Sequence, residues 1–342
     1  MAYITLNKNN FFNNLDIIKT QIKNIDKIAL VLKDNAYGHG LTQIANLAKE
    51  YGIKKAVVRT YEEALHVESY FEYVLILADF PKKYNNKFRY TINDINDIDN
   101  FPKDTKVELK VDTSMNRNGI STCRLQEAFE KIKKAQLSFE AVFTHHRSAD
   151  ELTSEWFVQN EIFETVKKEA QILAVEFGFG KLRFHSANSA SLFRHQSFDE
   201  DMVRVGIAAY GCMELPTALH VEDSLANLKP ILSVYANKIS SRELKKGECV
   251  GYGATFSSNK DLIVSNYDFG YADGFMRVNS NNYTTPNGEE LLGRISMDNS
   301  SFVSKKDKIL IFSDAREIAK TSKTISYEVL TSLKQNLKRV YV

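Results

Sequence analysis

Residues 27–33 read KIALVLK, and residues 34–40 read DNAYGHG. The first string is a short apolar run of the kind that forms a buried strand, and it ends in a lysine. The second string is rich in glycine and polar residues, which lets the backbone turn sharply and approach a ligand closely. Catalytic side chains of parallel-barrel enzymes lie at such carboxyl ends of strands, so Lys33 is the first candidate for a functional site.

Seven further apolar runs follow, and segments with the apolar spacing of helices separate most of them. Thr60 and Glu63 have the spacing of a capping box and predict the start of one such helix. The eight strands are predicted at 27–33, 54–59, 73–78, 88–93, 106–112, 139–145, 182–187 and 202–208. Eight consecutive β-then-α units indicate an α/β fold, a (β/α)8 TIM-like barrel. A doubly wound open sheet is the alternative, but no glycine fingerprint follows the first strand.

The pattern changes after residue 228, where short strand-like runs alternate with turn residues. The runs lie at 232–239, 249–256, 262–269, 290–295, 302–303 and 309–312. This alternation predicts a smaller, mostly β C-terminal domain. We therefore expect a barrel over 1–228 and a β domain over 229–342, with the first few residues available to pair with the second domain.

The composition indicates an ordinary globular protein. The 342 residues include 45 Lys and Arg against 43 Asp and Glu, a net charge of +2. Such a balance argues against a nucleic-acid or anionic-membrane partner, which would require a basic face. No apolar stretch reaches the length of a membrane span, and no signal peptide is expected at the N-terminus. The three cysteines, Cys123, Cys212 and Cys249, form no CxxC pair, so neither a disulfide framework nor a metal site is expected.

The string at residues 31–40 closely resembles the cofactor-binding signature of the alanine racemase family. The resemblance extends over essentially the full chain through further blocks in the same order. It implies that Lys33 holds pyridoxal 5′-phosphate as a Schiff base, since a partly desolvated lysine can lose its proton and attack an aldehyde. It also implies a barrel followed by a β domain, and a head-to-tail homodimer whose active sites are shared between subunits.

The second block, GYGATF at residues 251–256, resembles the family segment that supplies the opposing base. A racemase needs two bases, because the Cα proton leaves one face of the substrate and returns on the other. The resemblance implies that Lys33 takes one face and that Tyr252, entering from the partner subunit, takes the other. Phe256 stands where many members have tyrosine, which we interpret as a change in packing.

Further blocks imply the cofactor contacts. An unperturbed tyrosine has a pKa too high for an efficient base at neutral pH, so Tyr252 needs positive charge nearby. The resemblance supplies His145 and Arg204, in an expected chain Tyr252–His145–Arg204. It assigns Arg204 to the pyridine nitrogen, which an arginine leaves unprotonated. The phosphate contacts implied by the resemblance are Tyr37, Ser189, Gly206 and Ile207, with Ser189 at a helix start after the seventh strand.

Two more blocks imply the substrate contacts. Arg117 resembles the arginine that binds the substrate carboxylate, and Met297 resembles the residue that offers its backbone amide to the same group. The supporting residues implied by the family are Lys110, Tyr271 and Asp298. In many relatives the lysine at the position of Lys110 is carboxylated, which is a hypothesis here. The block around Arg117 departs from the commoner family pattern at Ser114, Asn116 and Asn118.

The C-terminal stretch 330–341 resembles the family least. Many members place a tyrosine there that narrows the substrate pocket, whereas the nearest positions in this chain are Lys334 and Gln335. We place Tyr327 too early and Tyr341 too late for this role. A more open pocket would accept serine or other small amino acids, because a small difference in an apolar pocket discriminates by only about 1–3 kcal/mol.

The expected function is interconversion of L-alanine and D-alanine in a bacterial cytoplasm, supplying D-alanine for peptidoglycan of the cell wall. A broader small-amino-acid (serine) racemase is the main alternative. An amino-acid decarboxylase of the same barrel class would lack the Tyr252 and Arg204 blocks. A non-catalytic carrier of the cofactor would generally lack the β domain.

Overall fold

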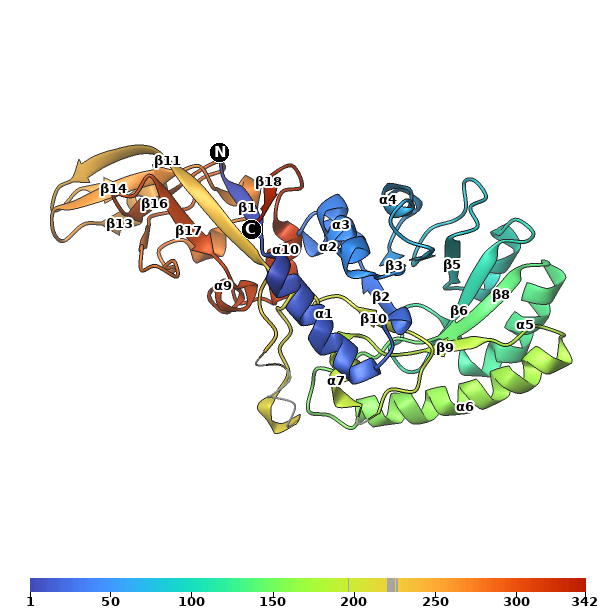
Figure 1. Ribbon diagram of the computed structural model, residues 1–342. Coiled ribbons are helices and arrows are strands. Elements are labelled where there is room, and N and C mark those ends of the chain that lie inside the picture. Colours follow the sequence, from blue (N-terminus) through green and yellow to red (C-terminus); the bar gives the residue numbers. More distant parts are fainter. Residues whose placement is uncertain (196, 220–224, 226) are drawn as a thin grey trace.

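The computed structural model describes residues 1–195, 197–219, 225 and 227–342. Figure 1 shows two parts side by side, a barrel from the first two-thirds of the chain and a mostly β part from the last third. Helix α1 and both chain termini lie at the junction between them. No helix in the described ranges is long and apolar enough to cross a membrane.

The barrel is a ring of parallel strands in the order β10-β2-β3-β4-β5-β6-β8-β9. Its strands are β2 (Ile28–Val31), β3 (Lys55–Val58), β4 (Tyr73–Ile76), β5 (Phe88–Ile92), β6 (Lys106–Asp112), β8 (Ser138–Phe143), β9 (Arg183–His185) and β10 (Val203–Val205). They lie where the eight predicted strands lie and in the same chain order, so the predicted barrel is confirmed. The ring is nearly closed, because Asn188 and Arg204 form an isolated parallel bridge between the segments of β9 and β10.

Helices and short connections surround this ring. Every residue of β2 and of β4 is buried, as expected of parallel strands that are covered on both faces. The predicted capping box is present at α4, where Thr60 and Glu63 bond each other's backbone amides. The remaining elements here are α1 (Lys8–Ile22), α2 (Lys33–Tyr37), α3 (Leu41–Tyr51), α4 (Tyr61–Val67), β7 (Ile120–Ser121), α5 (Leu125–Lys134), α6 (Glu155–Glu176) and α7 (Ser189–Arg194).

The C-terminal part is a mixed sheet in the order β15-β16-β14-β11-β1-β18, with β17 also paired to β11. The first strand of the chain, β1 (Tyr3–Leu6), belongs to this sheet, antiparallel to β11 and parallel to β18. The division at residues 228 and 229 stays a prediction. The other elements are β11 (Leu232–Leu244), β12 (Cys249–Val250), β13 (Phe256–Ser257), β14 (Leu262–Tyr267), β15 (Leu291–Leu292), β16 (Ser300–Val303), β17 (Lys308–Phe312), α9 (Ala315–Ser322), α10 (Ser326–Ser332) and β18 (Lys338–Tyr341).

This half departs from the sequence expectations in two respects. The run 249–256 is not one strand, because Gly251, Gly253 and Ala254 take left-handed backbone conformations with φ of 72°, 72° and 48°. These residues break the run into β12, a short turn that carries Tyr252, and β13. Helices α9 and α10 were not predicted. They matter for the site, because α10 packs against the turn that follows Lys33.

The short 3-10 helices are Ile25–Lys27, Ile95–Asn100, Thr122–Arg124, Thr217–Leu219, Tyr252–Ala254, Tyr271–Asp273 and Arg277–Asn279.

Candidate active site

Lys33 lies two residues after the end of β2 and opens a turn with an unusual backbone. Asp34, Asn35 and Ala36 have φ of 54°, 57° and 52°, so α2 is a left-handed turn and not an ordinary helix. Left-handed helical conformations cost L-residues about 1–2 kcal/mol each. Such a turn persists only where the surroundings hold it, which is a common property of functional sites.

Hydrogen bonds from within the barrel hold this turn. The Glu63 side chain accepts the backbone N–H of Asp34 at 2.7 Å, so the cap of α4 also anchors the site. The Nδ1–H of His39 donates to the carbonyl oxygens of Ala36 and Tyr37, both at 2.9 Å. Carbonyls accept only, so this geometry assigns the proton of His39 to Nδ1. The backbone after Lys33 is therefore fixed by side chains, despite its conformational cost.

The C-terminal end of the chain closes over the same turn. The guanidinium of Arg339, in β18, donates to the carbonyl oxygen of Gly38 at 3.1 and 2.8 Å. A Cβ at Gly38 would lie 1.9 Å from the carbonyl oxygen of Leu330 in α10. Only glycine permits this approach, and its φ of 76° independently favours glycine. The turn is thus held between the barrel and the C-terminal part of the same chain.

Three of the predicted phosphate contacts meet beside this turn. A Cβ at Gly206 would lie 2.9 Å from the hydroxyl oxygen of Tyr37, so the Tyr37 ring rests against the Gly206 backbone. The Ser189 hydroxyl oxygen accepts the backbone N–H of Gly206 at 3.0 Å. Ile207, the fourth predicted contact, follows Gly206 in the chain and is buried. The structure brings together Tyr37, Ser189 and Gly206, each from a different segment of the barrel.

Tyr327 was placed too early in the chain for a role at the pocket, and the structure revises that expectation. Its ring meets the ring of Tyr37 edge to face, with the centroids 5.7 Å apart. The reason is α10, which begins at Ser326 and packs against α2, so Tyr327 reaches the site before the final strand begins. A tyrosine from the C-terminal part therefore borders the Lys33 turn, although counting back from β18 does not identify it.

Arg204 is the buried middle residue of β10, and four of its five guanidinium N–H groups donate hydrogen bonds. Nη1 donates to Nδ1 of His185 at 2.5 Å and to the His185 carbonyl oxygen at 3.3 Å. Nη2 donates to the carbonyl oxygens of Thr144 and Ser186 at 2.7 and 2.8 Å. Four of its five N–H groups are thereby used, and Nε–H is the one left to meet another acceptor.

Within the described residues of one subunit, the hydrogen bonds do not follow the predicted series from Tyr252 through His145 to Arg204. Among the described residues, Arg204 bonds to His185, and no hydrogen bond joins it to His145. Sequence reasoning missed His185, although its position at the end of β9 was a signal, since strand ends carry the functional groups of barrels. His145 still lies near this charge: burial lowers its pKa well below the usual range, and Arg204 and Lys110 add to the effect.

Positive charge is concentrated at the mouth of the barrel. Burial lowers the pKa of Lys110 to about 8, and the charges of Arg117 and Arg204 act in the same direction. Lys33 contributes to the same lowering, so these side chains share one region. An anionic group such as a carboxylate or phosphate would relieve this repulsion.

The loop between Lys110 and Arg117 carries two of the three departures noted in the sequence, Ser114 and Asn116. Ser114 has φ of 96° and Asn116 has φ of 55°, both left-handed. The Asp112 side chain accepts both of their backbone N–H groups, at 3.0 and 3.1 Å. The loop is therefore ordered by Asp112, and Arg117 extends from it with an exposed side chain.

The remaining predicted residues form a second group, on the surface of the C-terminal part. Tyr252 is 67% exposed, Met297 54% and Tyr271 42%. Backbone bonds from Tyr271 to Ser296 and from Ala272 to Met297, each at 3.0 Å, join two of these segments. Asp298 follows Met297 and is also exposed.

The Tyr252 turn lies beside that group, because a Cβ at Gly253 would come within 3.1 Å of the Arg294 guanidinium. Within the described ranges, no recorded contact links Tyr252 to Lys33 of the same chain. The predicted site residues thus form two groups, one at the barrel mouth and one on the exposed face of the β part.

Comparison with known proteins gives a consistent match over both parts. The family profile for the alanine racemase N-terminal domain matches residues 6–214, and the profile for the C-terminal domain matches residues 231–341. An alanine racemase from Nitratiruptor is 45% identical over 342 residues, covering 100% of both chains. One from Campylobacter curvus is 41% identical over 344 residues, again covering 100% of both.

Solved structures give the same match. An alanine racemase from Clostridium difficile superposes with a TM-score of 0.87 at 25% identity, covering 100% of this chain and 95% of that one. The Bartonella henselae alanine racemase, with covalently bound pyridoxal phosphate, has a TM-score of 0.83 at 24% identity, covering 100% of this chain and 99% of that one. That likeness is one of fold.

Proposed function

This chain belongs to the alanine racemase family, and we propose on that premise that Lys33 and Tyr252 of the partner subunit are its two catalytic bases. The reaction is the family's pyridoxal 5′-phosphate-dependent interconversion of L-alanine and D-alanine, so the protein is an isomerase. The residue assignment rests on the separation of the predicted site residues into one group at the barrel mouth and another on the exposed face of the β part. Lys33 lies at a constrained turn in the barrel, while Tyr252 is 67% exposed on the other part of the chain.

The residues at the barrel mouth fit the cofactor. The hydroxyl groups of Tyr37 and Ser189 can each donate a hydrogen bond beside Gly206, where the absence of a Cβ lets the Tyr37 ring approach the backbone, and this arrangement suits a phosphate. The remaining Nε–H of Arg204 suits the pyridine nitrogen, and Lys33 suits the aldehyde. When bound, the cofactor withdraws the electron pair left on the substrate Cα after proton loss.

The two bases divide the work between the two faces of the substrate. Lys33 holds or releases the proton at Nζ on one face, and Tyr252 does so at its hydroxyl oxygen on the other. A tyrosine can serve as a base near neutral pH only if positive charge stabilises its anion. Lys110, Arg117 and Arg204 supply that charge at the barrel mouth of the opposite subunit.

The substrate carboxylate would meet Arg117, whose planar guanidinium can donate two parallel bonds, and the backbone amide of Met297. We also propose that Lys110 is carboxylated. Burial and neighbouring charges lower its pKa to about 8, which makes the neutral amine accessible. That amine adds to carbon dioxide, forming an N–C bond and releasing one proton. The resulting anion would pair with Arg117, and a 13C-labelled carbon dioxide NMR signal absent from Lys110→Ala would support it.

Alanine remains the proposed substrate, and the position of Tyr327 supports it over the broader racemase. The broader racemase was suggested by the lack of a pocket tyrosine in the C-terminal stretch, and we propose that Tyr327, whose ring meets that of Tyr37, takes this role. A racemisation assay over L-alanine, L-serine and L-lysine tests this proposal. A strong preference for the long basic substrate would contradict it.

We propose that the protein acts as a homodimer with shared sites in the cytoplasm, where its D-alanine enters peptidoglycan. The test uses two inactive variants. Tyr252→Phe should keep the absorbance of bound cofactor and lose most racemisation, whereas Lys33→Ala should lose both. Mixed after reversible dissociation, they should recover about a quarter of the parent activity, because hybrid dimers carry one intact site. No recovery from verified hybrid dimers would contradict shared sites.

A further inference from the structure

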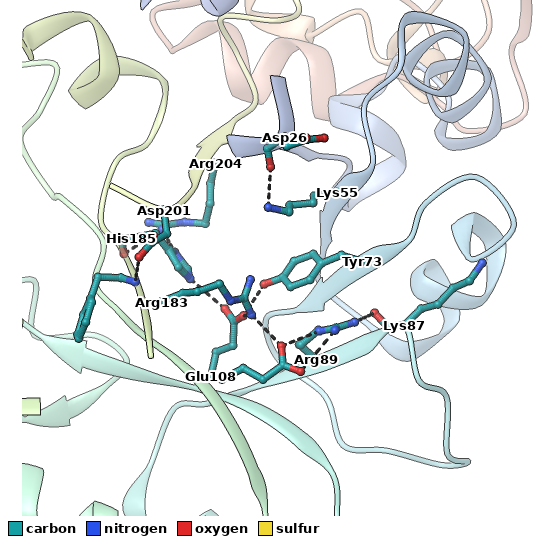
Figure 2. Close-up of polar contacts among 12 residues, drawn as sticks. Asp26, Lys55, Tyr73, Lys87, Arg89, Glu108, Arg183, His185, Asp201 and Arg204 are labelled. Atoms are coloured by element: carbon teal, nitrogen blue, oxygen red, sulfur yellow. Dashed lines mark hydrogen bonds and ion pairs between the residues drawn. The ribbon is translucent and has the colours of Figure 1, made fainter. Parts of the chain in front are cut away.

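Buried and partly buried charged side chains form a hydrogen-bonded network that includes His185, the partner of Arg204 (Figure 2). At its centre is Glu108, in β6, which is completely buried. Its Oε2 meets Nε2 of His185 at 2.9 Å, and its Oε1 accepts from the Tyr73 hydroxyl at 2.5 Å and from Arg183 at 2.8 Å. None of these three Glu108 contacts is part of the cofactor or substrate site described above, yet one of them reaches the partner of Arg204.

Glu108 is ionised and His185 is neutral near neutral pH. Burial alone would raise the pKa of Glu108, but the bonds and charges of His185 and Arg183 outweigh it and hold the pKa at about 2. Burial lowers the pKa of His185 to about 4, against the opposing effect of Glu108. A buried carboxylate therefore faces an imidazole that carries a single proton.

The two contacts of His185 decide where that proton lies. A carboxylate can only accept, so Nε2 carries the proton and donates it to Glu108. Nδ1 is then unprotonated and can accept the Nη1–H of Arg204, at 2.5 Å. The opposite tautomer would set an N–H of His185 against an N–H of Arg204, and it would leave the buried Glu108 oxygen without this donor.

We propose that Glu108 is a positioning residue for the reaction, holding His185 in its Nε2–H tautomer so that His185 orients Arg204. This inference rests on the proposed role of Arg204 at the pyridine nitrogen. With Nη1 and Nη2 engaged by His185, Thr144 and Ser186, the guanidinium presents Nε–H in one fixed direction. Loss of the Nδ1 acceptor would leave Nη1 with only its longer bond to the His185 carbonyl oxygen, at 3.3 Å, and would let the guanidinium turn.

Glu108 could instead serve only to neutralise Arg183, and Glu140 provides the matched control for that explanation. Glu140 accepts from the same Arg183 nitrogen at 2.8 Å and also pairs with Arg89 at 3.0 Å. None of the recorded contacts of Glu140 in the described ranges involves His185. Glu108→Gln and Glu140→Gln each remove one negative charge from the network, but only the first changes what His185 meets.

Glu108→Gln should reverse the tautomer of His185. The position of Oε1 accepts two donors, Tyr73 and Arg183, so the amide oxygen of the glutamine belongs there. The amide NH2 then faces Nε2, which must become the acceptor and pass its proton to Nδ1. That proton would oppose Arg204 directly.

The primary test is 15N NMR of the apo protein labelled at histidine, with His185 assigned by its loss in His185→Gln. We expect the Nε2–H tautomer in the parent chain, in Glu140→Gln and in Tyr73→Phe, and its loss in Glu108→Gln. An Nδ1–H tautomer in the parent chain overturns the proposal without any variant. Retention of the parent tautomer in folded Glu108→Gln also overturns it.

The second readout is cofactor binding and turnover of the holoenzyme. Glu108→Gln removes a hydrogen bond to a charged group, and such bonds contribute more free energy than bonds between neutral groups. We therefore expect Glu108→Gln to weaken cofactor affinity, or to lower kcat, by about tenfold or more. Glu140→Gln should stay within about threefold of the parent, as for a partly exposed ion pair. Equal losses in the two variants would assign Glu108 to neutralising Arg183 and overturn the positioning role.

The two readouts separate this inference from the proposed function. The tautomer is measured without cofactor or substrate, so it stands even if alanine is not racemised. If the parent enzyme fails to racemise alanine while His185 has the expected tautomer, the proposed function fails and the Glu108–His185 pairing does not.

Discussion

Gly206→Ala tests whether the cradle formed with Tyr37 holds the cofactor phosphate. The new Cβ would lie 2.8 Å from Cε2, 2.9 Å from the hydroxyl oxygen and 3.1 Å from Cζ of the Tyr37 ring. Non-bonded carbon atoms pack at about 3.5–4.0 Å, so the ring must move by about 0.7 Å or more. The backbone at Gly206 has no left-handed φ, so alanine itself is tolerated and the effect is steric.

Tyr37 cannot move freely, because its ring also meets Tyr210 and Tyr327, with centroids 5.4 and 5.7 Å away. Forcing a methyl group into such packing costs about 1–3 kcal/mol of stability. A hydroxyl displaced from a phosphate loses a bond worth about 1.5–3 kcal/mol. The dissociation constant of pyridoxal 5′-phosphate should therefore rise by about 10–100-fold.

The assay is titration of the apoenzyme with pyridoxal 5′-phosphate, followed by absorbance, together with denaturant unfolding. Gly180→Ala is the control, because no atom lies within 4 Å of its new Cβ and its φ is not left-handed. In a Tyr37→Ala background, Gly206→Ala should cost no further stability, since the clashing ring is gone. Cofactor affinity in Gly206→Ala equal to that in Gly180→Ala would refute the reasoning.

Three further predictions follow from strain, burial and contact. Ser114→Gly should raise the free energy of unfolding by about 1 kcal/mol, because φ of 96° strains a serine; an unchanged or lower melting temperature would contradict this. The pKa values of His39 and His185 are lowered by burial to about 4, so the unfolded chain binds protons that the native chain excludes. Stability should fall as pH drops from about 6.5 to 4, by about 1.4 kcal/mol per pH unit for each histidine, and a constant urea midpoint over that range would disprove it. Arg339→Met should cost about 1–3 kcal/mol in urea unfolding, because the buried Gly38 carbonyl loses its donor; parent-like stability would show that water replaces it.

Much of the barrel could be predicted because its signals are local. Most of the eight strands are short runs rich in apolar residues, and the capping box of α4 is a spacing of three residues. The C-terminal part was less predictable. The run 249–256 has β-forming residues, but its glycines adopt left-handed conformations and turn the chain outward at Tyr252. A continuous strand and a broken one have similar composition, so the pattern alone did not separate them.

In the candidate site, too, the features with local sequence signals were predictable and those set by tertiary packing were not. Resemblance of short blocks was sufficient to propose Lys33, Tyr252, Arg204 and the phosphate contacts. It did not identify Tyr327 as a neighbour of Tyr37, because the distance along the chain from β18 says nothing about where α10 packs. It also linked Arg204 to His145, whereas the hydrogen bond goes to His185.

The sequence by itself determined the kinds of elements, their order and the chemistry at the strand ends, since apolar period, turn residues and reactive groups are properties of short segments. Only the tertiary structure decided which side chains meet inside the barrel. Closing the ring brings β6, β9 and β10 together, so that Glu108, His185 and Arg204 form one buried line although no local pattern joins them. Burial then gives these contacts their effect, because a charged or polar group removed from water must find its partner within the fold.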